Sequence, residues 1–432
     1  MNLFGSMNVR DNALYIGEIS AKSLAENFGT PLYVMDEELM RQSCKSYIEN
    51  FKVKESGNKV AYAGKAFLTK AMCNLINEEG MCLDVVSGGE LYTAYKSGFP
   101  MNKIYFHGNN KTKDEIEMGI KLGVGKFVAD NFYELELISS IAKKLNKTQE
   151  VLLRVTPGIE AHTHSYIKTG QLDSKFGFTV LDNIVLKAVK TCSDLDNIEF
   201  MGLHCHIGSQ IFETKPYEEE VDILFELANN VQKELGIEVK EIDLGGGFGI
   251  YYKKGDEPKS AKTFCTSILN QAEKVCEKLN MKMPILVIEP GRSIVGNAGT
   301  TLYSVGSIKE IPSVRKYVSV DGGMTDNIRP ALYNSEYECM VCNNIKSEVS
   351  NEVRLVGKCC ESGDVLINNI SITEPKTGDI LAVLNTGAYG YSMSSNYNKI
   401  PRAAVVLVNK DKAKVICKRQ TYDELISNEL DL

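Results

Sequence analysis

The sequence predicts an α/β protein in which an N-terminal (β/α)8 TIM-like barrel precedes a C-terminal β-rich domain. Between residues 59 and 289, eight short apolar runs alternate with amphipathic stretches. This alternation is typical of right-handed βαβ units in a parallel sheet, and eight such units are enough to close a barrel. After Gly299, strand-like runs follow one another with turns between them and few helical periods, which indicates a separate β domain. A doubly wound open sheet is the second possibility for the first part of the chain.

The eight runs are rich in β-branched and aromatic residues, as expected of strands buried on both faces. The stretches between them place apolar residues at helical spacing, for example over residues 68–79, 89–97, 132–145 and 217–235. In order, the runs are KVAYA at 59, CLDVV at 82, KIYFH at 103, KFVAD at 126, VLLRV at 151, FMGLHCHI at 200, VKEIDL at 239 and ILVIEP at 285.

The barrel is expected to span residues 31–295 and the β domain residues 296–432. Residues 1–30 are too irregular for barrel structure, and we expect them to pack with the β domain. The strand-like runs of that domain are TLYSVGSI at 301, YVSVDGG at 317, EVRLVGK at 352, ILAVLNTG at 380, AAVVLVN at 403 and KAKVICK at 412.

Charge and terminal sequence narrow the class of protein. The 432 residues include 49 Lys and Arg against 56 Asp and Glu, a formal net charge of −7. This mildly acidic balance argues against nucleic acid or an anionic membrane as the main partner. Arg10 and Asp11 interrupt the N-terminal segment before a signal-peptide core can develop, and no stretch reaches the ~20 apolar residues of a membrane span. We therefore expect a cytoplasmic protein.

The 12 cysteines are scattered along the chain, so free thiols are expected rather than a disulfide framework. Cys339-x-x-Cys342 together with Cys359 and Cys360 allows a four-thiolate zinc site. Adjacent cysteines of an extended chain point to opposite sides, however, and do not easily share one tetrahedral metal. We expect no metal there.

Polar residues stand where the apolar runs end. In a (β/α)8 barrel the chemistry gathers at these carboxyl ends. Any one of these residues is explained equally well by the change from strand to loop, but their combined chemistry indicates a site. They are Lys65, Ser87, His107, Asp130, Arg154, His206, Ser209, the glycines at 245–247, Glu289 and Arg292.

The glycine run at 245–249 (GGGFG) directly follows the seventh strand. Glycines allow backbone N–H groups to turn toward an anion at close range, so this loop could bind a phosphate; a simple tight turn explains it equally well. The spacing does not match a dinucleotide-binding fingerprint. The loop Glu289-Pro290-Gly291-Arg292 after strand eight favours the phosphate, because barrel phosphate sites are usually built from the loops after strands seven and eight.

Lys65 lies just beyond the first strand, among small and apolar residues. A lysine at such a position usually extends its charge into water. If it points into the mouth of the barrel instead, burial and neighbouring cations would lower its pKa and make it a competent Schiff-base nucleophile.

The histidines suggest a second functional class. His162-x-His164 and His204-x-His206 each place two imidazoles on one face of an extended segment, which suits a zinc hydrolase. Such a site would need carboxylate ligands at later strand ends, and Asp243 is followed by glycines instead of facing a ligand set. A histidine stacked on an aromatic cofactor explains an inward imidazole equally well.

Nine motifs occur in order along nearly the whole chain, from about residue 25 to residue 408. Together they resemble the diaminopimelate decarboxylases, which are alanine-racemase-like (fold type III) pyridoxal-phosphate decarboxylases. The resemblance implies a barrel followed by a β domain, in agreement with the pattern above. The motifs are AYAGKAF, DVVSGGE, HTHSYIKTGQLDSKFGF, GLHCHIGSQ, DLGGGFGI, EPGR, DGGMTDNIRPALY, CESGD and GAYGYSMSSNYN.

The resemblance also implies roles for single residues. Lys65 would bind pyridoxal 5′-phosphate covalently, His206 would stack on its ring, and Glu289 would face its pyridine nitrogen. Cys360 would be a catalytic residue supplied by the partner subunit, since these enzymes share active sites across a head-to-tail homodimer. The phosphate would be held by Ser209, Gly246, Gly247, Gly291, Arg292 and Tyr389. The substrate would be bound by Arg292, Arg329, Tyr333, Glu361 and Tyr389.

Within this family the motifs favour meso-2,6-diaminopimelate, with L-lysine and CO2 as products. Two arginines suit its distal carboxylate, because a planar guanidinium grips a carboxylate bidentately, and Glu361 suits the distal ammonium. A sibling enzyme acting on ornithine, arginine or carboxynorspermidine remains an alternative, as does a non-catalytic relative, although Lys65 and Cys360 are both retained. Two departures from the family pattern, KIPR at 399–402 and Lys358-Cys359 before Cys360, touch no catalytic position.

Overall fold

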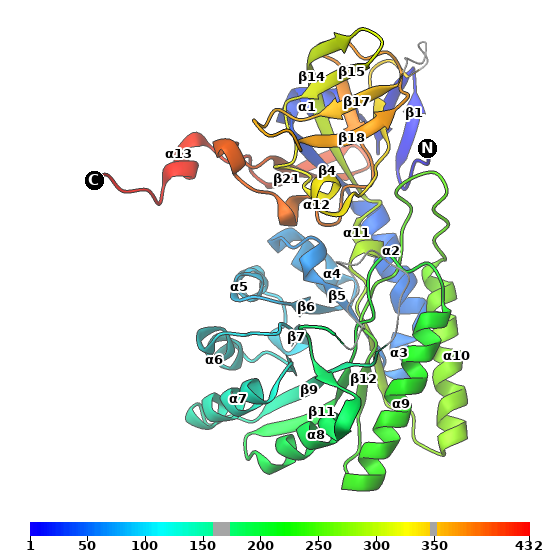
Figure 1. Ribbon diagram of the computed structural model, residues 1–432, viewed down its shortest axis with the longest axis vertical. Coiled ribbons are helices and arrows are strands. Elements are labelled where there is room, and N and C mark those ends of the chain that lie inside the picture. The colour runs from blue at the N-terminus through cyan, green and yellow to red at the C-terminus, as the bar shows by residue number, and fades with distance from the viewer. Residues whose placement is uncertain (159–172, 346–351) are drawn as a thin grey trace. The chain divides into compact units, whose positions relative to one another are not determined.

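The computed structural model describes residues 1–158, 173–345 and 352–432, which form two compact units. Unit 1 comprises Met1–Gln42, Ile250–Glu257 and Arg292–Leu432, and unit 2 comprises Ser43–Gly249 and Pro258–Gly291 (Figure 1). Among the described residues, no helix combines the length and the apolar character needed to cross a membrane.

Unit 2 contains a closed barrel of eight parallel strands. Each strand pairs with the next, and the last strand pairs again with the first, so the sheet has no free edge. The predicted (β/α)8 barrel is thus confirmed, and the open-sheet alternative is wrong. The strands are β5 (Lys59–Ala63), β6 (Cys82–Val85), β7 (Ile104–Phe106), β8 (Lys126–Ala129), β9 (Gln149–Thr156), β11 (Ile198–His204), β12 (Glu241–Asp243) and β13 (Ile285–Ile288). The short β10 (Phe178–Thr179) extends the pairing beside β9.

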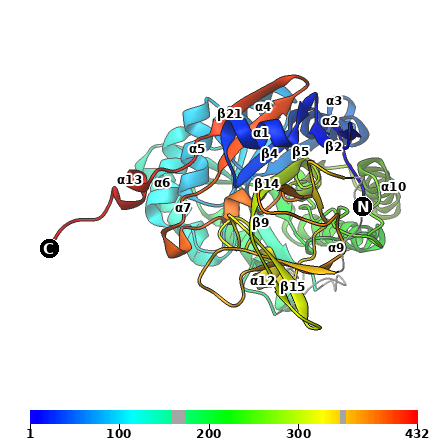
Figure 2. The same ribbon diagram turned by 90° about the horizontal axis from the view of Figure 1, so that it is seen from above.

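Helices cover the outside of these strands, with α5 to α7 and α9 with α10 at different parts of the circumference (Figures 1 and 2). Most begin at a Ser, Thr or Asn whose side chain accepts a hydrogen bond from the first turn, as at Thr69, Ser87, Thr112, Asn131 and Ser260. The helices are α2 (Glu37–Asn50), α3 (Val53–Ser56), α4 (Lys70–Glu78), α5 (Gly88–Ser97), α6 (Lys113–Leu122), α7 (Phe132–Lys144), α8 (Ile184–Asp194), α9 (Lys215–Leu235) and α10 (Ala261–Leu279).

The middle of the barrel is a packed apolar layer. Side chains that alternate along the strands point inward and meet on the axis, as in other barrels of this type. This layer separates two polar ends of the barrel. Its buried members are Ala61, Tyr105, Val128, Leu152 and Val287, against which Cys82 and Met201 pack.

Unit 1 is built on a mixed sheet with β14 (Gly299–Ile311) near its centre. Its main path runs in the order β18, β17, β15, β14, β4, β20, β21, and β19 also pairs with β14 and with β16. The N-terminal hairpin packs in the same unit, where Leu14 and Ile16 share a core with Leu302. The other strands are β1 (Met7–Arg10), β2 (Ala13–Ile16), β3 (Ile19–Ser20), β4 (Leu32–Asp36), β15 (Arg315–Val320), β16 (Cys339–Val341), β17 (Val353–Val356), β18 (Val365–Ile370), β19 (Ile380–Val383), β20 (Ala404–Asn409) and β21 (Lys412–Cys417). Its helices are α1 (Ala21–Phe28), α11 (Arg292–Val295), α12 (Arg329–Tyr333) and α13 (Tyr422–Ile426).

The division into units differs from the expected boundaries in two places. Strand β4 was expected in the barrel but pairs with β14 and β20, so the barrel unit begins only at Ser43. Residues 250–257 also belong to unit 1, where Ile250 and Tyr252 join its core. Both assignments depend on partners distant in sequence, such as Tyr303 and Leu302, which a local pattern does not reveal.

Candidate functional site

Lys65 lies in the first turn after β5, within the short helix Gly64–Ala66, at the carboxyl end of the barrel. Its side chain is partly buried, and its charge acts on Asp84, Glu90 and His206. Gly64 leaves no room for a side chain, because a Cβ there would lie 2.7 Å from the carbonyl oxygen of Asp84. The turn therefore lies directly against β6.

A buried cluster of acidic and imidazole groups surrounds Glu289, which follows β13. His107 Nε2 lies 2.8 Å from Glu289 Oε1, and His204 Nε2 lies 3.4 Å from Glu289 Oε2. The two imidazole rings meet edge to face, with centroids 4.8 Å apart. Asp84 Oδ1 lies 3.8 Å from His107 Nε2, and Asp243 is fully buried at the end of β12.

The acidic and imidazole groups of this cluster differ in their pKa shifts and therefore in their charge. Burial by itself would raise the pKa of Glu289, but its contacts with the imidazoles, chiefly that of His107, hold that pKa well below its usual range. Burial raises the pKa of Asp84, and burial together with the neighbouring Glu289 raises the pKa of Asp243 well above its usual range. Burial lowers the pKa of His204 to about 3, so this imidazole is neutral near neutral pH. Glu289 is therefore the stable anion of the cluster.

His206 is held in a defined orientation by the glycine loop. The backbone N–H of Gly246 donates to His206 Nδ1 at 3.2 Å, so Nδ1 is an acceptor. Burial, together with the positive charges of Lys65 and Arg154, lowers the pKa of His206 well below its usual range. A neutral imidazole fixed through Nδ1 presents a flat ring at the carboxyl end of the barrel.

The glycines at 245–247 allow three loops to approach one another closely. A Cβ at Gly246 would lie 2.1 Å from the carbonyl oxygen of Glu289, and one at Gly247 would lie 2.3 Å from that of Gly208. Gly247 has φ +100°, a conformation that other residues rarely adopt. Gly291 lies equally close to Ala63, whose Cβ would be 2.8 Å from a new side chain. The loops after β11, β12 and β13 thus meet beside the turn of Lys65, and Ser209 lies on the first of them.

The cluster suits an aromatic nitrogen cofactor of the pyridoxal type. Glu289 Oε1 is buried and makes no hydrogen bond within the described residues, although His107 Nε2 is near. A buried carboxylate of low pKa with an available oxygen matches a protonated ring nitrogen. The partly buried amine of Lys65 and the glycine-lined loops lie at the same end of the barrel, so the residues present fit this group.

The same histidine and carboxylate side chains are relevant to the alternative of a zinc hydrolase. Ligand atoms of His107, His204, Asp243 and Glu289 lie within 4.8 Å of one another, the one such group among residues 1–158, 173–345 and 352–432. The expectation that Asp243 does not face a ligand set is therefore wrong: its side chain points inward from the last position of β12, in register with His204. His206 is not a member of this group, and His162-x-His164 lies outside the described residues.

The four-thiolate zinc site does not form among the described residues. Cys339 and Cys342 belong to different apolar cores of unit 1, one on each side of the sheet, and Cys359 and Cys360 join no ligand group with them. Burial raises the pKa of the Cys339 thiol to about 12, as expected of an inert structural cysteine.

Within unit 1, three of the expected ligand-binding residues lie together with two tyrosines. Arg292 Nη1 donates to the hydroxyl of Tyr252 at 2.6 Å, and Arg329 Nη1 donates to that of Tyr337 at 2.5 Å. The guanidinium carbon of Arg292 lies 4.8 Å from the ring centroid of Tyr389. Burial would raise the pKa of Tyr252, but the two arginines lower it. Two buried guanidinium groups in one place form a strong site for anionic groups.

The other expected residues of unit 1 are more exposed. Tyr333 is the partly buried last residue of α12, and Cys360 and Glu361 are exposed on the loop that precedes β18. The backbone N–H of Cys360 donates to Asn398 Oδ1 at 2.8 Å. Tyr389 is partly buried and has φ +60°, a strained conformation for an aromatic residue that is often kept for function.

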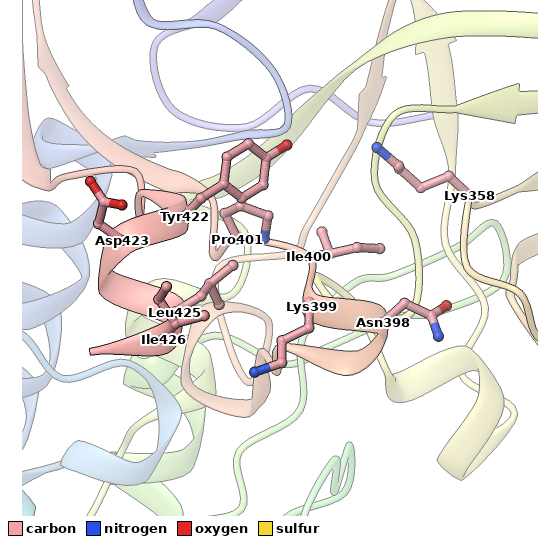
Figure 3. Close-up of a pocket in the computed structure, with 9 residues that line it drawn as sticks. All are labelled: Lys358, Asn398, Lys399, Ile400, Pro401, Tyr422, Asp423, Leu425 and Ile426. Carbon is pink, nitrogen blue, oxygen red and sulfur yellow. The ribbon is translucent and has the colours of Figure 1, made fainter. Parts of the chain in front are cut away.

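A cavity of about 620 Å³ lies elsewhere in unit 1, away from the arginine cluster. Most of its lining side chains come from the segment before β20 and from α13 (Figure 3). The lining residues are Lys358, Asn398, Lys399, Ile400, Pro401, Tyr422, Asp423, Leu425 and Ile426. None of the expected cofactor or substrate ligands is among them.

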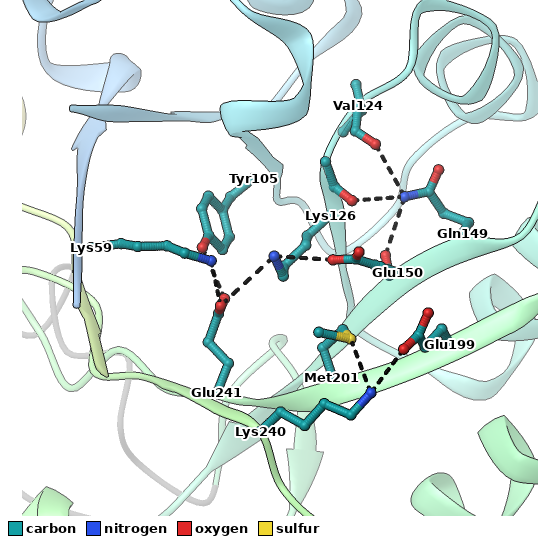
Figure 4. A network of polar contacts seen from close by, with 11 residues as sticks. Lys59, Tyr105, Val124, Lys126, Gln149, Glu150, Glu199, Met201, Lys240 and Glu241 are labelled. Atoms are coloured by element: carbon teal, nitrogen blue, oxygen red, sulfur yellow. Dashed lines mark hydrogen bonds and ion pairs between the residues drawn. The ribbon is translucent and has the colours of Figure 1, made fainter. Parts of the chain in front are cut away.

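The amino ends of the barrel strands carry a second polar network, in which both carboxylate oxygens of Glu241 have partners. Glu241 Oε2 lies 2.6 Å from Lys59 Nζ and 3.7 Å from Lys126 Nζ, and Glu241 Oε1 accepts from the Tyr105 hydroxyl at 2.8 Å (Figure 4). Lys126 Nζ also lies 3.1 Å from Glu150. The partners of Glu241 are side chains of the protein itself, as expected of a structural network.

Sequence reasoning missed Asp84, Tyr252 and Tyr337. Asp84 could have been found, because it interrupts an apolar strand and lies two residues after Cys82, on the inward face. The two tyrosines carry no comparable signal, since their role depends on arginines 40 and 8 residues away in sequence.

Comparison with known proteins identifies the family of this chain. Residues 38–296, more than half of the chain, match the family described as pyridoxal-dependent decarboxylase, pyridoxal binding domain. The chain is 48% identical to the diaminopimelate decarboxylase of Bacillus subtilis, over 96% of this chain and 95% of that protein. It is 45% identical to that of Staphylococcus aureus, over 97% and 98% of the two chains.

Solved structures show the same architecture. The crystal structure of diaminopimelate decarboxylase from M. jannaschii in complex with L-lysine superposes with a TM-score of 0.93, at 40% identity, and the match covers 99% of this chain and 98% of that one. A lysine/ornithine decarboxylase from Vibrio vulnificus, at 22% identity and a TM-score of 0.77, shares the fold. By family match, identity and coverage, the chain belongs to the diaminopimelate decarboxylases, within the pyridoxal-dependent decarboxylase family.

Proposed function

We propose that this protein decarboxylates meso-2,6-diaminopimelate to L-lysine and CO2, the last step of lysine biosynthesis, with pyridoxal 5′-phosphate as cofactor. The observation that carries the proposal is the presence of Lys65 and of the buried Glu289 anion at the same end of the barrel. Relatives of 48% identity over nearly the full length carry the name of this activity.

The cofactor would be held by residues from the carboxyl ends of the barrel strands. Lys65 would bind it covalently, Glu289 would keep its pyridine nitrogen protonated, and the neutral ring of His206 would stack on it. When bound, the cofactor supplies an electron sink for the pair of electrons left by departing CO2. The phosphate would be bound by Ser209, Gly246, Gly247, Gly291, Arg292 and Tyr389.

The substrate would be selected by its second amino-acid head. Arg292 and Arg329 are buried guanidinium groups that suit a distal carboxylate, and exposed Glu361 suits a distal ammonium. Tyr333 and Tyr389 would complete the contacts. These groups orient the substrate rather than take part in bond breaking.

The proton that replaces CO2 would come from Cys360 of a second copy of the chain. Cys360 is exposed on its loop, so its thiol is accessible to another subunit. We therefore propose a homodimer with shared active sites, located in the cytoplasm.

The decisive experiment offers the holoenzyme meso-diaminopimelate, ornithine, arginine and carboxynorspermidine separately and measures CO2 and amine product. Stoichiometric L-lysine from meso-diaminopimelate, with at least about 100-fold lower kcat/KM for the others, is expected because they lack the distal carboxylate for the two arginines. Preference for ornithine or arginine would contradict the proposal. A chelator should leave turnover unchanged, whereas loss of turnover would favour the metal hydrolase.

A further inference from the structure

Residues 421–432, which we call the C-terminal arm, follow β21 and leave the sheet of unit 1. In both views the arm extends away from that sheet to the end of the chain (Figures 1 and 2). Every residue of the arm except Leu425 is exposed. The exposed fractions of Tyr422, Ile426 and Leu430 are 77%, 53% and 95%, which is unusual for large apolar side chains concentrated in one short segment.

The arm nevertheless has a defined helix start. Thr421 and Glu424 form a capping box, in which the Glu424 N–H donates to Thr421 Oγ1 at 3.1 Å and the Thr421 N–H donates to Glu424 Oε2 at 2.8 Å. Helix α13 itself has only five residues, far too few to be stable alone in water. Tyr422 and Ile426, four residues apart, share one side of the helix. A short capped helix with an open apolar side requires a surface on which to pack.

The arm lies beside the loop of Cys360. The cavity of Figure 3 is lined both by α13 and by Lys358 and Asn398. Asn398 Oδ1 also accepts the hydrogen bond from the backbone N–H of Cys360. The face of unit 1 that presents Cys360 is therefore continuous with the arm.

We propose that the C-terminal arm docks on a second copy of this chain, against the exposed aromatic side chains of α5 and of the start of α7. The inference rests on the proposed function, in which Cys360 reaches the active site of the second copy. Because the arm lies beside the loop of Cys360, it would contact the second copy close to the point that Cys360 reaches.

The receiving surface lies at the rim of that active site. Helices α5 and α7 follow β6 and β8 directly, so their first turns lie at the carboxyl ends of the barrel strands. Phe132 and Tyr133 begin α7 and are 36% and 68% exposed, and Tyr92 and Tyr95, further along α5, are 51% and 45% exposed. Aromatic side chains of this kind are enriched in the buried centres of protein interfaces.

Charge also matches between the two surfaces. The arm contains Asp423, Glu424, Glu429 and Asp431 and no lysine or arginine. On α5, Lys96 Nζ lies 5.3 Å from the ring centroid of Tyr92 and 5.6 Å from that of Tyr95. An acidic, apolar arm and an aromatic surface carrying a lysine are complementary partners.

The test measures dimer dissociation of the holoenzyme by sedimentation over a range of protein concentrations. The variant combines Tyr422→Ser, Ile426→Ser and Leu430→Ser, and Val314→Ser is the matched control, since Val314 is 70% exposed in unit 1 outside the arm. The dissociation constant should rise at least about tenfold in the triple variant and stay unchanged in the control. An unchanged constant in the triple variant, or a wild type that is monomeric throughout, would overturn the proposal.

A second measurement locates the docking surface. With Leu430→p-benzoylphenylalanine, irradiation should give a covalent dimer cross-linked within residues 88–97 or 132–144. Cross-links confined to one chain, or to another part of the second copy, would overturn the proposal. Neither measurement requires substrate, so each reports on the arm even if wild-type protein fails to decarboxylate meso-diaminopimelate, a failure that would count against the proposed function alone.

Discussion

The two ends of the barrel use the same strands for opposite purposes. Strand β12 begins with Glu241 and ends with Asp243, two residues apart on the same inward face. At the amino end, both oxygens of Glu241 are engaged by lysines and a tyrosine. At the carboxyl end, Asp243 Oδ2 and Glu289 Oε1 are buried and make no hydrogen bond among the described residues.

This difference indicates which end of the barrel binds a ligand. A buried polar group without a partner costs about 1–3 kcal/mol, so a fold retains a cluster of them only where something else satisfies them. The atoms without such a partner at the carboxyl end include His204 Nδ1 and Asp84 Oδ1. The saturated amino end holds the barrel together, and the unsaturated end is available for the cofactor.

The largest effect is expected from the two lysines that flank strand β5. Lys65→Ala should reduce CO2 release from meso-diaminopimelate by more than about 10⁴-fold, because it removes the covalent attachment of the cofactor. Lys59→Ala, at the other end of β5, should leave kcat within about twofold. Equal losses of turnover in the two variants would contradict the assignment of different roles to the two ends of the barrel.

Glu289→Gln should lower kcat by about 10²–10³-fold, since the amide cannot hold a proton on the cofactor ring nitrogen. The side chain keeps its shape, so the variant should still fold. Glu241→Gln is the control at the opposite end, and its kcat should match that of wild type. Steady-state assays of both variants decide this, and a wild-type kcat for Glu289→Gln would contradict the assignment.

Glu241→Gln should instead lower the free energy of unfolding by about 2–3 kcal/mol, because Lys59 and Lys126 lose their buried carboxylate partner. Lys59 is partly exposed, so water replaces part of its interaction and limits the loss of stability. Chemical unfolding of the holoenzyme measures it. Glu199→Gln is the matched control: Glu199 lies 2.8 Å from Lys240, but both side chains are about half exposed. Its stability should stay within about 0.5 kcal/mol of wild type, and equal losses would refute the structural role of the network.

The smallest effect concerns pH. Burial lowers the pKa of His204 to about 3 in the folded protein, whereas an unfolded histidine has a pKa of about 6.5. The unfolded chain therefore binds more protons between these values, and stability falls as pH drops from about 6.5 toward 3. Between about pH 7 and pH 5, wild type should lose about 2 kcal/mol more than His204→Gln does. Parallel pH profiles for the two proteins would show that His204 is not buried in its neutral form.

Much of the barrel could be predicted from sequence because its signals are local. The run KVAYA coincides with β5, and polar residues follow the strands at the carboxyl end of the barrel. The glycine run GGGFG after strand seven predicts a close turn, and the structure has Gly246 and Gly247 packed closely against neighbouring loops. The barrel was expected to start at residue 31, yet Leu32–Asp36 is a strand of unit 1. An apolar run of five residues predicts a strand but not its partners.

The contents of the site could be predicted only in part. His206 and Glu289 were predicted as site residues from their place after strands, and family resemblance supplied the roles proposed for them. The pairing of Tyr252 with Arg292 is a tertiary contact that neither periodicity nor motif reveals. The prediction for Asp243 was wrong because it relied on the glycines that follow this residue. The side chain of Asp243, two residues from Glu241, points into the barrel.

The account depends on Lys65 being the residue that holds the cofactor at the unsaturated end of the barrel. Reduction of the holoenzyme with borohydride, followed by peptide mapping, tests this directly, because it fixes the cofactor to the lysine that carries it. The account predicts one pyridoxyl group per chain, on Lys65. A label on any other lysine, or none at all, would contradict it.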